Sequence, residues 1–545
     1  FDGMTSSERS TLCEVRNRAG ACESGCPPRP KLRTEALVDV EGLGMLNRVR
    51  REGAQYRTFG KELRMGPMTS ECTGTGRKPN IVFILSDDLS WGDLGCYGQT
   101  KIQTPNIDRL ADEGIRFTQC YAGNSVCAPS RSCLMEGLHP GHARVRGNAY
   151  KGYRHALQLE DATVAEVLKE AGYATGLFGK WGLALSDQPG IPRRKGFDEF
   201  RGYLNQRKAH NYYPPFLWHN EERVRFPQHE GFRYREQSPY DDDGQVMPLG
   251  MKDPAKAVYS FDYYTEASLD FVREHRDEPF FLYLAYTIPH GALIAPNLAA
   301  YADMDWPSLR HREWAAMITR MDDEVGNILD LITELGLDDD TIIFFASDNG
   351  YSAYGYDRDA DGPSFEEFFD NMGPTKGRKG GSDDGSFRVP CMARWPGQIQ
   401  PGQVSDLIWA FWDFLPTAAD LGGGGTPDAV DGLSILPTLL GQDGDQQQHE
   451  FLYWEYGQAQ AVRMDNWYAR RPSGGTTELY DILQDPDQAM DLAGQRPEVV
   501  GRVEDIFEES HRPSEVWPSP GESQEAYAQR LADMGLEPWS ENIDG

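Results

Sequence analysis

The sequence predicts an α/β protein. We expect a large mixed, mostly parallel sheet flanked by helices, and a smaller C-terminal α+β subdomain built on an antiparallel sheet. Continuous apolar, β-branched runs alternate with amphipathic segments, which is typical of parallel strands buried on both faces. Four glycines at 422–425 are expected to form a flexible break, and after them the pattern changes to short strand-like segments. The chain therefore divides into an irregular extension, an α/β domain and a C-terminal subdomain, over residues 1–78, 79–421 and 422–545.

The composition narrows the class of protein. The 545 residues are 39% hydrophobic and 26% charged, as in ordinary globular proteins, but the net charge is −31. This charge argues against a nucleic-acid partner, because phosphate binding requires a basic face. No apolar run reaches the roughly 20 residues of a membrane span. Because the chain begins at Phe1, we expect a processed or partial product with no signal peptide visible. The acidic charge fits an extracellular setting, and we expect a protein that is secreted, periplasmic or in the secretory pathway.

Nine cysteines are present, and an odd number leaves at least one without an intrachain disulfide partner. Cys127 is our candidate for the unpaired one. Four others crowd the leading segment, where we expect disulfides: Cys13, Cys22, Cys26 and Cys72. A zinc site is less favoured there, since the spacing lacks paired C-x-x-C motifs.

Strands and helices alternate through the α/β domain. Strands are predicted at 80–85, 114–117, 173–178, 279–286 and 341–346. Helices are predicted from Thr104, and at 130–138, 161–171, 261–275 and 312–335. Residues 186–258 are predicted to be irregular, with an aromatic stretch at 205–219 that packs toward a substrate. Short antiparallel strands are predicted at 451–454, 459–464 and 467–470, with a partly helical tail beyond 495.

Polar side chains follow several of the predicted strands. Asp87, Asp88, Asp348 and Asn349 lie at strand exits, where open α/β sheets bind ligands. Adjacent carboxylates are unfavourable there without a cation, although a helix N-cap is an alternative explanation for them. Oxygen ligands of this kind suit Ca²⁺, or less favourably Mg²⁺, rather than zinc.

Basic groups accompany these oxygens. Arg131, Lys180 and Lys379 supply positive charge and His290 supplies a proton donor, although a surface lysine is the commoner explanation for a residue such as Lys180. A divalent ion with basic groups around a nucleophile is the arrangement that stabilises a transferring oxyanion. Cys127, near the start of a predicted helix, lies where developing negative charge is favoured.

The stretch Cys127-Ala128-Pro129-Ser130-Arg131, with Gly137 ten positions after the cysteine, resembles the signature of the sulfatase family. A buried structural cysteine beside a turn is the alternative explanation. In that family the cysteine is oxidised to formylglycine by a formylglycine-generating enzyme. One hydroxyl of the hydrated aldehyde attacks sulfur, and the other collapses to expel sulfate. The resemblance implies an alkaline-phosphatase-like fold and a sulfated small molecule or carbohydrate as substrate.

Further motifs extend the resemblance in order along residues 78 to 500. They are Pro79-Asn80 through Asp87-Asp88, Gly179-Lys180-Trp181, Pro289-His290, Ser347-Asp348-Asn349-Gly350, Lys379 nine positions before Arg388-Val389-Pro390, and Glu478-Leu479-Tyr480-Asp481. By position, the resemblance implies metal binding by Asp87, Asp88, Asp348, Asn349 and modified Cys127. It likewise implies that Arg131 holds the formylglycine, Lys180 and Lys379 bind sulfate oxygens, and His290 protonates the leaving oxygen.

One departure bears on catalysis. The family often has histidine two positions after the lysine of its G-K-W motif, and this chain has Gly182 there. We expect His210 to replace the missing base, although a loop histidine that caps backbone groups is equally compatible with the sequence. The function predicted is hydrolysis of sulfate esters. The alternatives are a phosphatase or phosphodiesterase of the same superfamily, against which Cys127 argues, and a non-catalytic sulfate-ligand-binding homologue, which Gly182 makes conceivable.

Overall fold

The computed structural model describes residues 77–148, 155–352, 363–518 and 522–536. All but the last two residues of the predicted N-terminal extension lie outside these ranges. So do its four cysteines: Cys13, Cys22, Cys26 and Cys72. The main sheet has ten strands in the order β11-β2-β10-β9-β1-β8-β4-β5-β6-β7. Their bounds are β1 Asn80–Asp87, β2 Ile115–Phe117, β4 Ala174–Lys180, β5 Glu199–Tyr203, β6 Phe216–His219, β7 Glu222–Arg225, β8 Phe280–Pro289, β9 Thr341–Ser347, β10 Cys391–Arg394 and β11 Gln403–Ser405.

The centre of the sheet is parallel. Strand β1 pairs in parallel with β8 on one side and with β9 on the other, and β4 pairs in parallel with β8 and β5. Every residue of β1 is buried, because helices cover both faces of the sheet. Antiparallel strands β10 and β6 then join the two sides of this parallel core. The sheet is therefore mixed and mostly parallel at its centre, as the sequence predicts.

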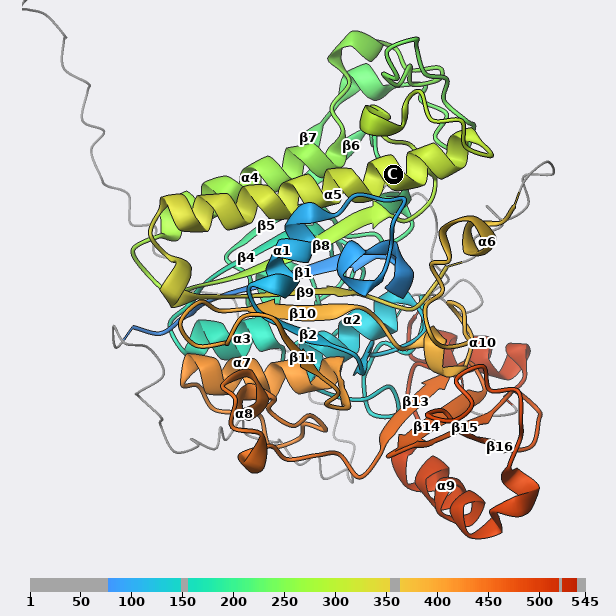
Figure 1. Cartoon of the computed structure of the whole chain (residues 1–545). Helices are drawn as coiled ribbons and strands as arrows, with labels where there is room; N and C mark the ends of the chain where they lie inside the picture. The colour runs from blue at the N-terminus through green and yellow to red at the C-terminus, as the bar shows by residue number, and fades with distance from the viewer. Residues whose placement is uncertain (1–76, 149–154, 353–362, 519–521, 537–545) are drawn as a thin grey trace, which may run out of the picture. The chain divides into compact units, whose positions relative to one another are not determined.

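Alternate side chains of β1 enter two different cores. Val82 and Ile84 pack under helices α1 Pro105–Asp112, α4 Ser260–His275 and α5 Leu309–Glu334. Ile81 and Phe83 pack on the opposite face, which is covered by α2 Cys127–Glu136, α3 Val164–Glu170 and α7 Phe414–Gly422. Figure 1 shows these two helical layers above and below the strands. Because successive side chains of a strand point to opposite faces, β1 contributes residues to both hydrophobic cores.

Two predictions about irregular segments are wrong. Residues 186–258 contain β5, β6 and β7, which extend the main sheet beyond β4. Their mixed composition hides the strands, because β7 lies at the sheet edge and β6 pairs with β5 only at Arg201–His219 and Gly202–Trp218. The four glycines do not mark a flexible break at their start, since Gly422 is the last residue of α7 and Gly423 caps it with φ 62°.

The C-terminal subdomain carries a four-stranded antiparallel sheet in the order β13-β14-β15-β16. Its elements are β13 Leu452–Tyr456, β14 Ala459–Met464, β15 Trp467–Arg471, β16 Glu478–Asp481, α9 Pro497–Ser510 and α10 Gln524–Asp533. Buried bonds tie it to the α/β core: Trp454 donates Nε1–H to the Ala122 carbonyl, and Arg146 pairs with Glu455 at 2.9 Å. The boundary at 421 stays a prediction. The remaining short elements are β3 Cys120–Tyr121, β12 Trp409–Ala410, α6 Phe365–Phe369 and α8 Leu436–Leu439.

Within the described residues, five cysteines are free: Cys96, Cys120, Cys127, Cys133 and Cys391. No helix in the described ranges is long and apolar enough to cross a membrane.

Candidate active site

The predicted site residues converge at the carboxyl edge of the parallel core. Strand register brings them together: Asp87 on β1 aligns with Pro289 on β8, and Ser86 aligns with Ser347 on β9. Asp88, His290 and Asp348 follow these aligned residues directly. Six side chains at this edge are almost completely buried: Asp87, Asp88, Lys180, His290, Asp348 and Asn349. Chain segments far apart in sequence therefore build one site.

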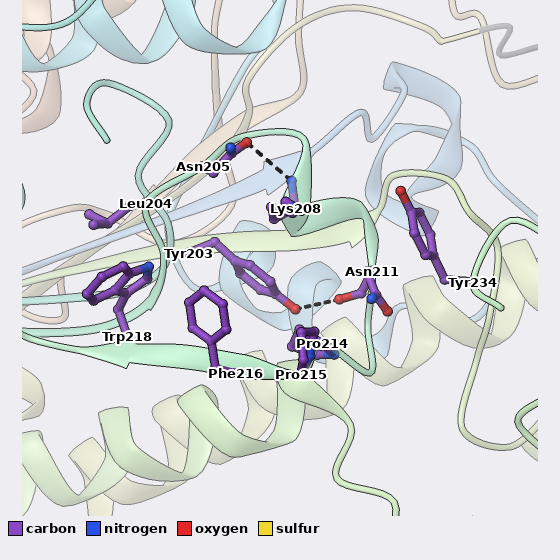
Figure 2. Close-up of a pocket in the computed structure, with 10 residues that line it drawn as sticks. All are labelled: Tyr203, Leu204, Asn205, Lys208, Asn211, Pro214, Pro215, Phe216, Trp218 and Tyr234. Carbon is purple, nitrogen blue, oxygen red and sulfur yellow. Dashed lines mark hydrogen bonds between the residues drawn. The ribbon is translucent and has the colours of Figure 1, made fainter. Parts of the chain in front are cut away.

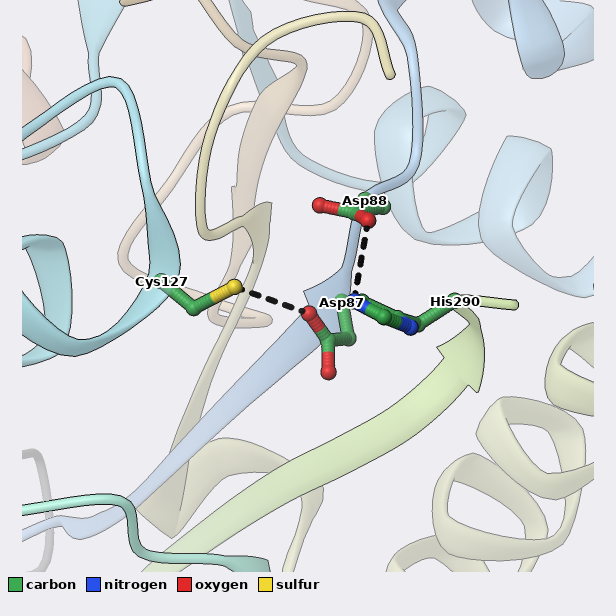
Figure 3. A group of neighbouring side chains, drawn as sticks. All are labelled: Asp87, Asp88, Cys127 and His290. Carbon is green, nitrogen blue, oxygen red and sulfur yellow. Dashed lines mark hydrogen bonds and ion pairs between the residues drawn. The ribbon is translucent and has the colours of Figure 1, made fainter. Parts of the chain in front are cut away.

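Cys127 is the first residue of α2, and every residue of that helix is buried. Its sulfur lies 3.5 Å from Asp87 Oδ1, and the Lys379 ammonium lies 3.0 Å from the same sulfur. Figure 3 shows the thiol pointing toward Asp87, beside Asp88 and His290. The helix start contributes partial positive charge at this point. The nucleophile position therefore combines a carboxylate, an ammonium and a helix N-terminus.

Buried ion pairs hold the carboxylates in place. Lys180 Nζ lies 2.6 Å from Asp87 Oδ2, and Lys379 Nζ lies 2.6 Å from Asp88 Oδ1. Arg131 donates from Nε and a terminal nitrogen to the same Asp348 oxygen, at 3.0 and 2.9 Å, and from its other terminal nitrogen to the Lys180 carbonyl. Lys180 is thus a buried partner of a carboxylate and not a surface lysine.

The oxygen atoms at this edge fit a metal ion. Asp87, Asp88, Cys127 and His290 each offer a ligand atom within 4.8 Å of the others. Asp88 Oδ2 and Asn349 Oδ1 are buried and, among the described residues, accept no hydrogen bond. Buried polar atoms are normally satisfied, so these two unsatisfied oxygens, on residues joined by a 2.7 Å hydrogen bond, fit a metal ion. Asp348 Oδ1 is held nearby by the Asp88 backbone N–H at 3.2 Å.

Burial shifts the pKa of several site groups. It raises the pKa of the Cys127 thiol to about 12, although Lys180 and Lys379 oppose this shift. Burial and the neighbouring Asp87 charge raise the pKa of Asp348. Burial, Lys379 and Lys180 hold the pKa of His290 well below its usual range. Its Nδ1–H donates to the Gly291 carbonyl, which turns Nε2 toward Asp88 Oδ2 at 3.4 Å.

His210 reaches the site from the loop after β5. Its ring stacks on the His290 ring with centroids 3.7 Å apart and an interplanar angle of 21°. Burial and the neighbouring His290 hold its pKa well below the usual range. His210 Nε2 is buried and has no hydrogen-bond partner among the described residues. The structure thus places the expected replacement histidine beside His290 and does not show it capping a backbone group through Nε2.

Sequence reasoning missed Gln206. A Cβ atom added at Gly182 would lie 3.2 Å from Gln206 Oε1, and Gly182 has φ 78°. Gln206 therefore occupies space beside the position of the missing histidine. The signal was available, because Gln206 belongs to the same aromatic loop as His210.

A second group of metal-ligating side chains was also missed. His139, His142 and Asp431 gather ligand atoms within 4.8 Å of one another. His142 Nδ1 lies 2.9 Å from Asp431, and the Gly141 N–H donates to His139 Nδ1. Asp431 lies almost three hundred residues from the two histidines, so no local motif could have joined them.

Comparison with known proteins assigns the family. The sulfatase family model matches residues 79–424, and the model of the N-sulphoglucosamine sulphohydrolase C-terminal region matches 382–503. The chain belongs to the sulfatase family. The match covers the main sheet and every predicted site residue, which confirms the resemblance seen in the sequence.

Relatives and solved structures agree with this assignment. N-acetylgalactosamine-6-sulfatase of Homo sapiens is 33% identical over 68% of this chain and 67% of its own length. Arylsulfatase A of Homo sapiens is 30% identical over 79% of this chain and 87% of its own length. The crystal structure of Ps i-CgsB in complex with k-i-k-neocarrahexaose has a TM-score of 0.67 and 25% identity, and the match covers 84% of this chain and 98% of that one. This sulfatase therefore has the family fold as well as the family sequence.

Proposed function

We propose that this sulfatase hydrolyses sulfate esters through a formylglycine derived from Cys127. The observation that carries the proposal is the position of Cys127 as the first residue of a buried helix, within 3.5 Å of Asp87 and 3.0 Å of Lys379. When hydrated, the aldehyde would supply a hydroxyl nucleophile. Arg131, which is paired with Asp348 at 2.9 Å, would hold the formylglycine in place.

Ca²⁺ is the ion that we propose for the metal site, with Mg²⁺ less favoured. Asp87, Asp88, Asp348 and Asn349 would hold it together with the modified Cys127. Their oxygens are hard ligands, and Ca²⁺ accepts six to eight of them in irregular geometry. Mg²⁺ requires near-ideal octahedral geometry and usually keeps several waters. When bound, the ion would neutralise the clustered carboxylates and polarise a sulfate oxygen.

Two lysines and one histidine would act on different parts of the sulfate ester. Lys180 and Lys379 would bind sulfate oxygens, because both ammonium groups already face the nucleophile edge through Asp87 and Asp88. His290 would protonate the leaving oxygen. A sulfate in the site offsets the positive charge of the two lysines, and so favours the protonated imidazole that this role requires.

His210 would take the part of the histidine that Gly182 replaces. It approaches from a different loop and stacks on His290, so its imidazole lies at the reaction edge. Because its Nε2 has no hydrogen-bond partner among the described residues, it is available to accept a proton from the hydrate. If His210 does not act in this way, Gly182 favours a second function, a homologue that binds sulfated ligands without turnover.

We propose a sulfated carbohydrate as the substrate class, since N-acetylgalactosamine-6-sulfatase and a structure that holds k-i-k-neocarrahexaose are among the relatives. A formylglycine-generating enzyme would be the maturation partner. The crowded cysteines at 13, 22 and 26 and the net charge of −31 support action in the secretory pathway, the periplasm or outside the cell.

The proposal is tested by peptide mass spectrometry and by turnover together. In protein made with a formylglycine-generating enzyme, the peptide from Phe117 to Arg131 should carry an aldehyde in place of the thiol. The same material should release sulfate from 4-nitrophenyl sulfate, and the Cys127→Ala variant should not. An aldehyde-bearing, Ca²⁺-loaded protein that hydrolyses no sulfate ester would refute the enzyme, and an unmodified thiol in native material would favour the binding protein.

A further inference from the structure

A cavity of about 130 Å³ lies at the end of β5, the strand that pairs with β4 and its Lys180. It lies between the end of β5 and the loop and strand that follow, as Figure 2 shows. Tyr203, one of its lining residues, is aligned with Lys180 in the β4–β5 register. Lys208, another lining residue, precedes His210 by two positions in the same short helical turn. The cavity is therefore one strand away from the groups that face the nucleophile.

Aromatic rings form much of its wall. Tyr203, Phe216 and Trp218 line it, and Phe216 and Trp218 meet edge to face with centroids 5.7 Å apart. The Tyr203 hydroxyl donates to the Asn211 carbonyl at 2.6 Å, which fixes that ring. The Arg223 guanidinium lies 4.5 Å from the Phe216 ring centroid and 5.0 Å from that of Trp218, and Arg223 is not among the lining residues. The platform is thus rigid before any ligand arrives.

Two polar groups at the cavity lack partners. Lys208 is exposed, and no ion pair to its ammonium is found within the described ranges. Asn205 is 2% exposed, and its Nδ2 has no hydrogen-bond partner in the described part of the chain, while its Oδ1 accepts from the Arg207 N–H. An unpaired cation is notable on a chain with a net charge of −31. Together these groups offer hydrogen-bond donors to an anionic, hydroxyl-rich ligand.

We propose that this cavity is the subsite for the sugar ring next to the sulfated one in an anionic oligosaccharide. The inference rests on the proposed sulfatase function and deepens it. A pyranose presents C–H groups on one face, which would pack on Tyr203, Phe216 or Trp218, and hydroxyls at its rim, which suit Asn205. Lys208 would bind a sulfate or carboxylate group carried by that ring.

The size and polarity of the cavity favour this occupant over others. Sites for whole drug-sized ligands measure about 300–1,000 Å³. A cavity of about 130 Å³ takes one ring, so the fused rings of a steryl sulfate would exceed it. A plain aryl group would fit by size but would leave Lys208 and Asn205 without partners, which is unfavourable for the buried amide.

The test compares substrates of different length. Hexasaccharides prepared from carrageenan and from chondroitin 6-sulfate are the long probes, and 4-nitrophenyl sulfate is the short one. With Lys208→Ala, we expect kcat/KM for the better hexasaccharide to fall about tenfold more than kcat/KM for the short probe, as for the loss of one charged hydrogen bond. With Phe216→Ala, kcat/KM for the hexasaccharide should also fall more than that for the short probe, because the sugar ring loses a surface to pack on. Lys256→Ala is the control, because that side chain is 76% exposed and pairs only locally with Asp253.

The outcomes separate the subsite from the enzyme. An equal change in kcat/KM for long and short probes, with unchanged thermal unfolding, overturns the subsite and leaves the sulfatase function intact. If the aldehyde-bearing protein hydrolyses no sulfate ester, the proposed function fails, and calorimetric binding of the two hexasaccharides decides the subsite. Binding that Lys208→Ala weakens about tenfold supports it. Absence of binding, or equal Kd for wild type and Lys208→Ala, overturns it.

Discussion

The imidazole rings of His210 and His290 lie face to face with their centroids 3.7 Å apart. His290 follows β8 at the centre of the sheet, and His210 comes from the loop after β5. The stack therefore carries a loop residue into the core of the site. It also places two imidazoles with lowered pKa values side by side.

His210→Ala should lower turnover far more than substrate binding. Loss of a general base typically reduces kcat about 10²–10⁴-fold, and KM should change little because His290 and the lysines remain. Steady-state kinetics on 4-nitrophenyl sulfate would measure both constants. His219→Ala is a matched control, since His219 is 41% exposed at the end of β6. A near-wild-type kcat for His210→Ala would show that another group, or none, replaces the base.

Removal of the metal should destabilise the protein. Asp87, Asp88 and Asp348 are completely buried, and a bound cation offsets their mutual repulsion. A ligand present at 100 times its Kd adds about 2.7 kcal/mol to the free energy of unfolding. We expect EDTA to lower Tm in differential scanning calorimetry, and Ca²⁺ to restore it at lower concentration than Mg²⁺. Identical Tm values with and without EDTA would argue against the ion.

Arg131→Ala and Arg131→Lys should separate charge from geometry. Two of the three hydrogen bonds from Arg131 end on one oxygen of Asp348, and both side chains are almost fully buried. Alanine leaves the carboxylate unpaired, which typically costs about 3–5 kcal/mol. Lysine keeps the positive charge but lacks the two guanidinium nitrogens that donate to Asp348. We therefore expect a smaller loss of stability but a large loss of kcat. Urea unfolding and kinetics on the same samples would reveal whether both variants instead behave alike.

Gly182→His should not rescue a His210→Ala variant. Gly182 has φ 78°, a left-handed conformation that costs a side chain about 1–2 kcal/mol. A Cβ there would also lie 3.2 Å from Gln206 Oε1. Gly172→Ala is the matched control for backbone strain alone, because Gly172 has φ 90° but no neighbour within 4 Å of an added Cβ. A double variant that regains wild-type kcat would contradict this prediction.

Glu136→Gln should flatten the pH dependence of stability. Burial, aided by Asp161, raises the pKa of Glu136 from 4.5 to about 8. The folded state therefore keeps a proton that the unfolded chain releases, so the free energy of unfolding falls as pH rises through this interval. The slope is at most about 1.4 kcal/mol per pH unit for one group. We expect the Tm of wild type, relative to Glu136→Gln, to decrease from about pH 5 to about pH 8. A constant difference would show that Glu136 is ionised in the folded state.

The sequence was sufficient for the parallel core and for the residues at its edge. Runs such as 80–85 and 341–346 are almost entirely apolar, so they can be assigned as buried strands without knowledge of the strands that they pair with. Parallel pairing then aligns Asp87 with Pro289, directly before His290. Because the carboxyl ends of parallel strands share one edge, the convergence of Asp88, Asp348 and Lys180 follows from topology alone.

Other features depend on partners that the sequence does not show. Strands β5 to β7 were missed because their residues, such as Arg201, Trp218 and Arg223, have no strand-like pattern of their own. They form strands only through pairing of β5 with β6 and of β6 with β7. The small strand β16 was missed for the same reason, although its residues 478–481 carried the resemblance. The His139, His142 and Asp431 group depends on tertiary contacts between distant segments.

The burial of Cys127 has a consequence for the order of events in biosynthesis. In the folded chain its sulfur is completely enclosed, on a helix that has no exposed residue. If Cys127 is oxidised as proposed, the oxidising enzyme must reach it before the sheet closes over it, because the folded chain leaves this residue completely unexposed. A molecule that folded before this proposed step would keep its thiol.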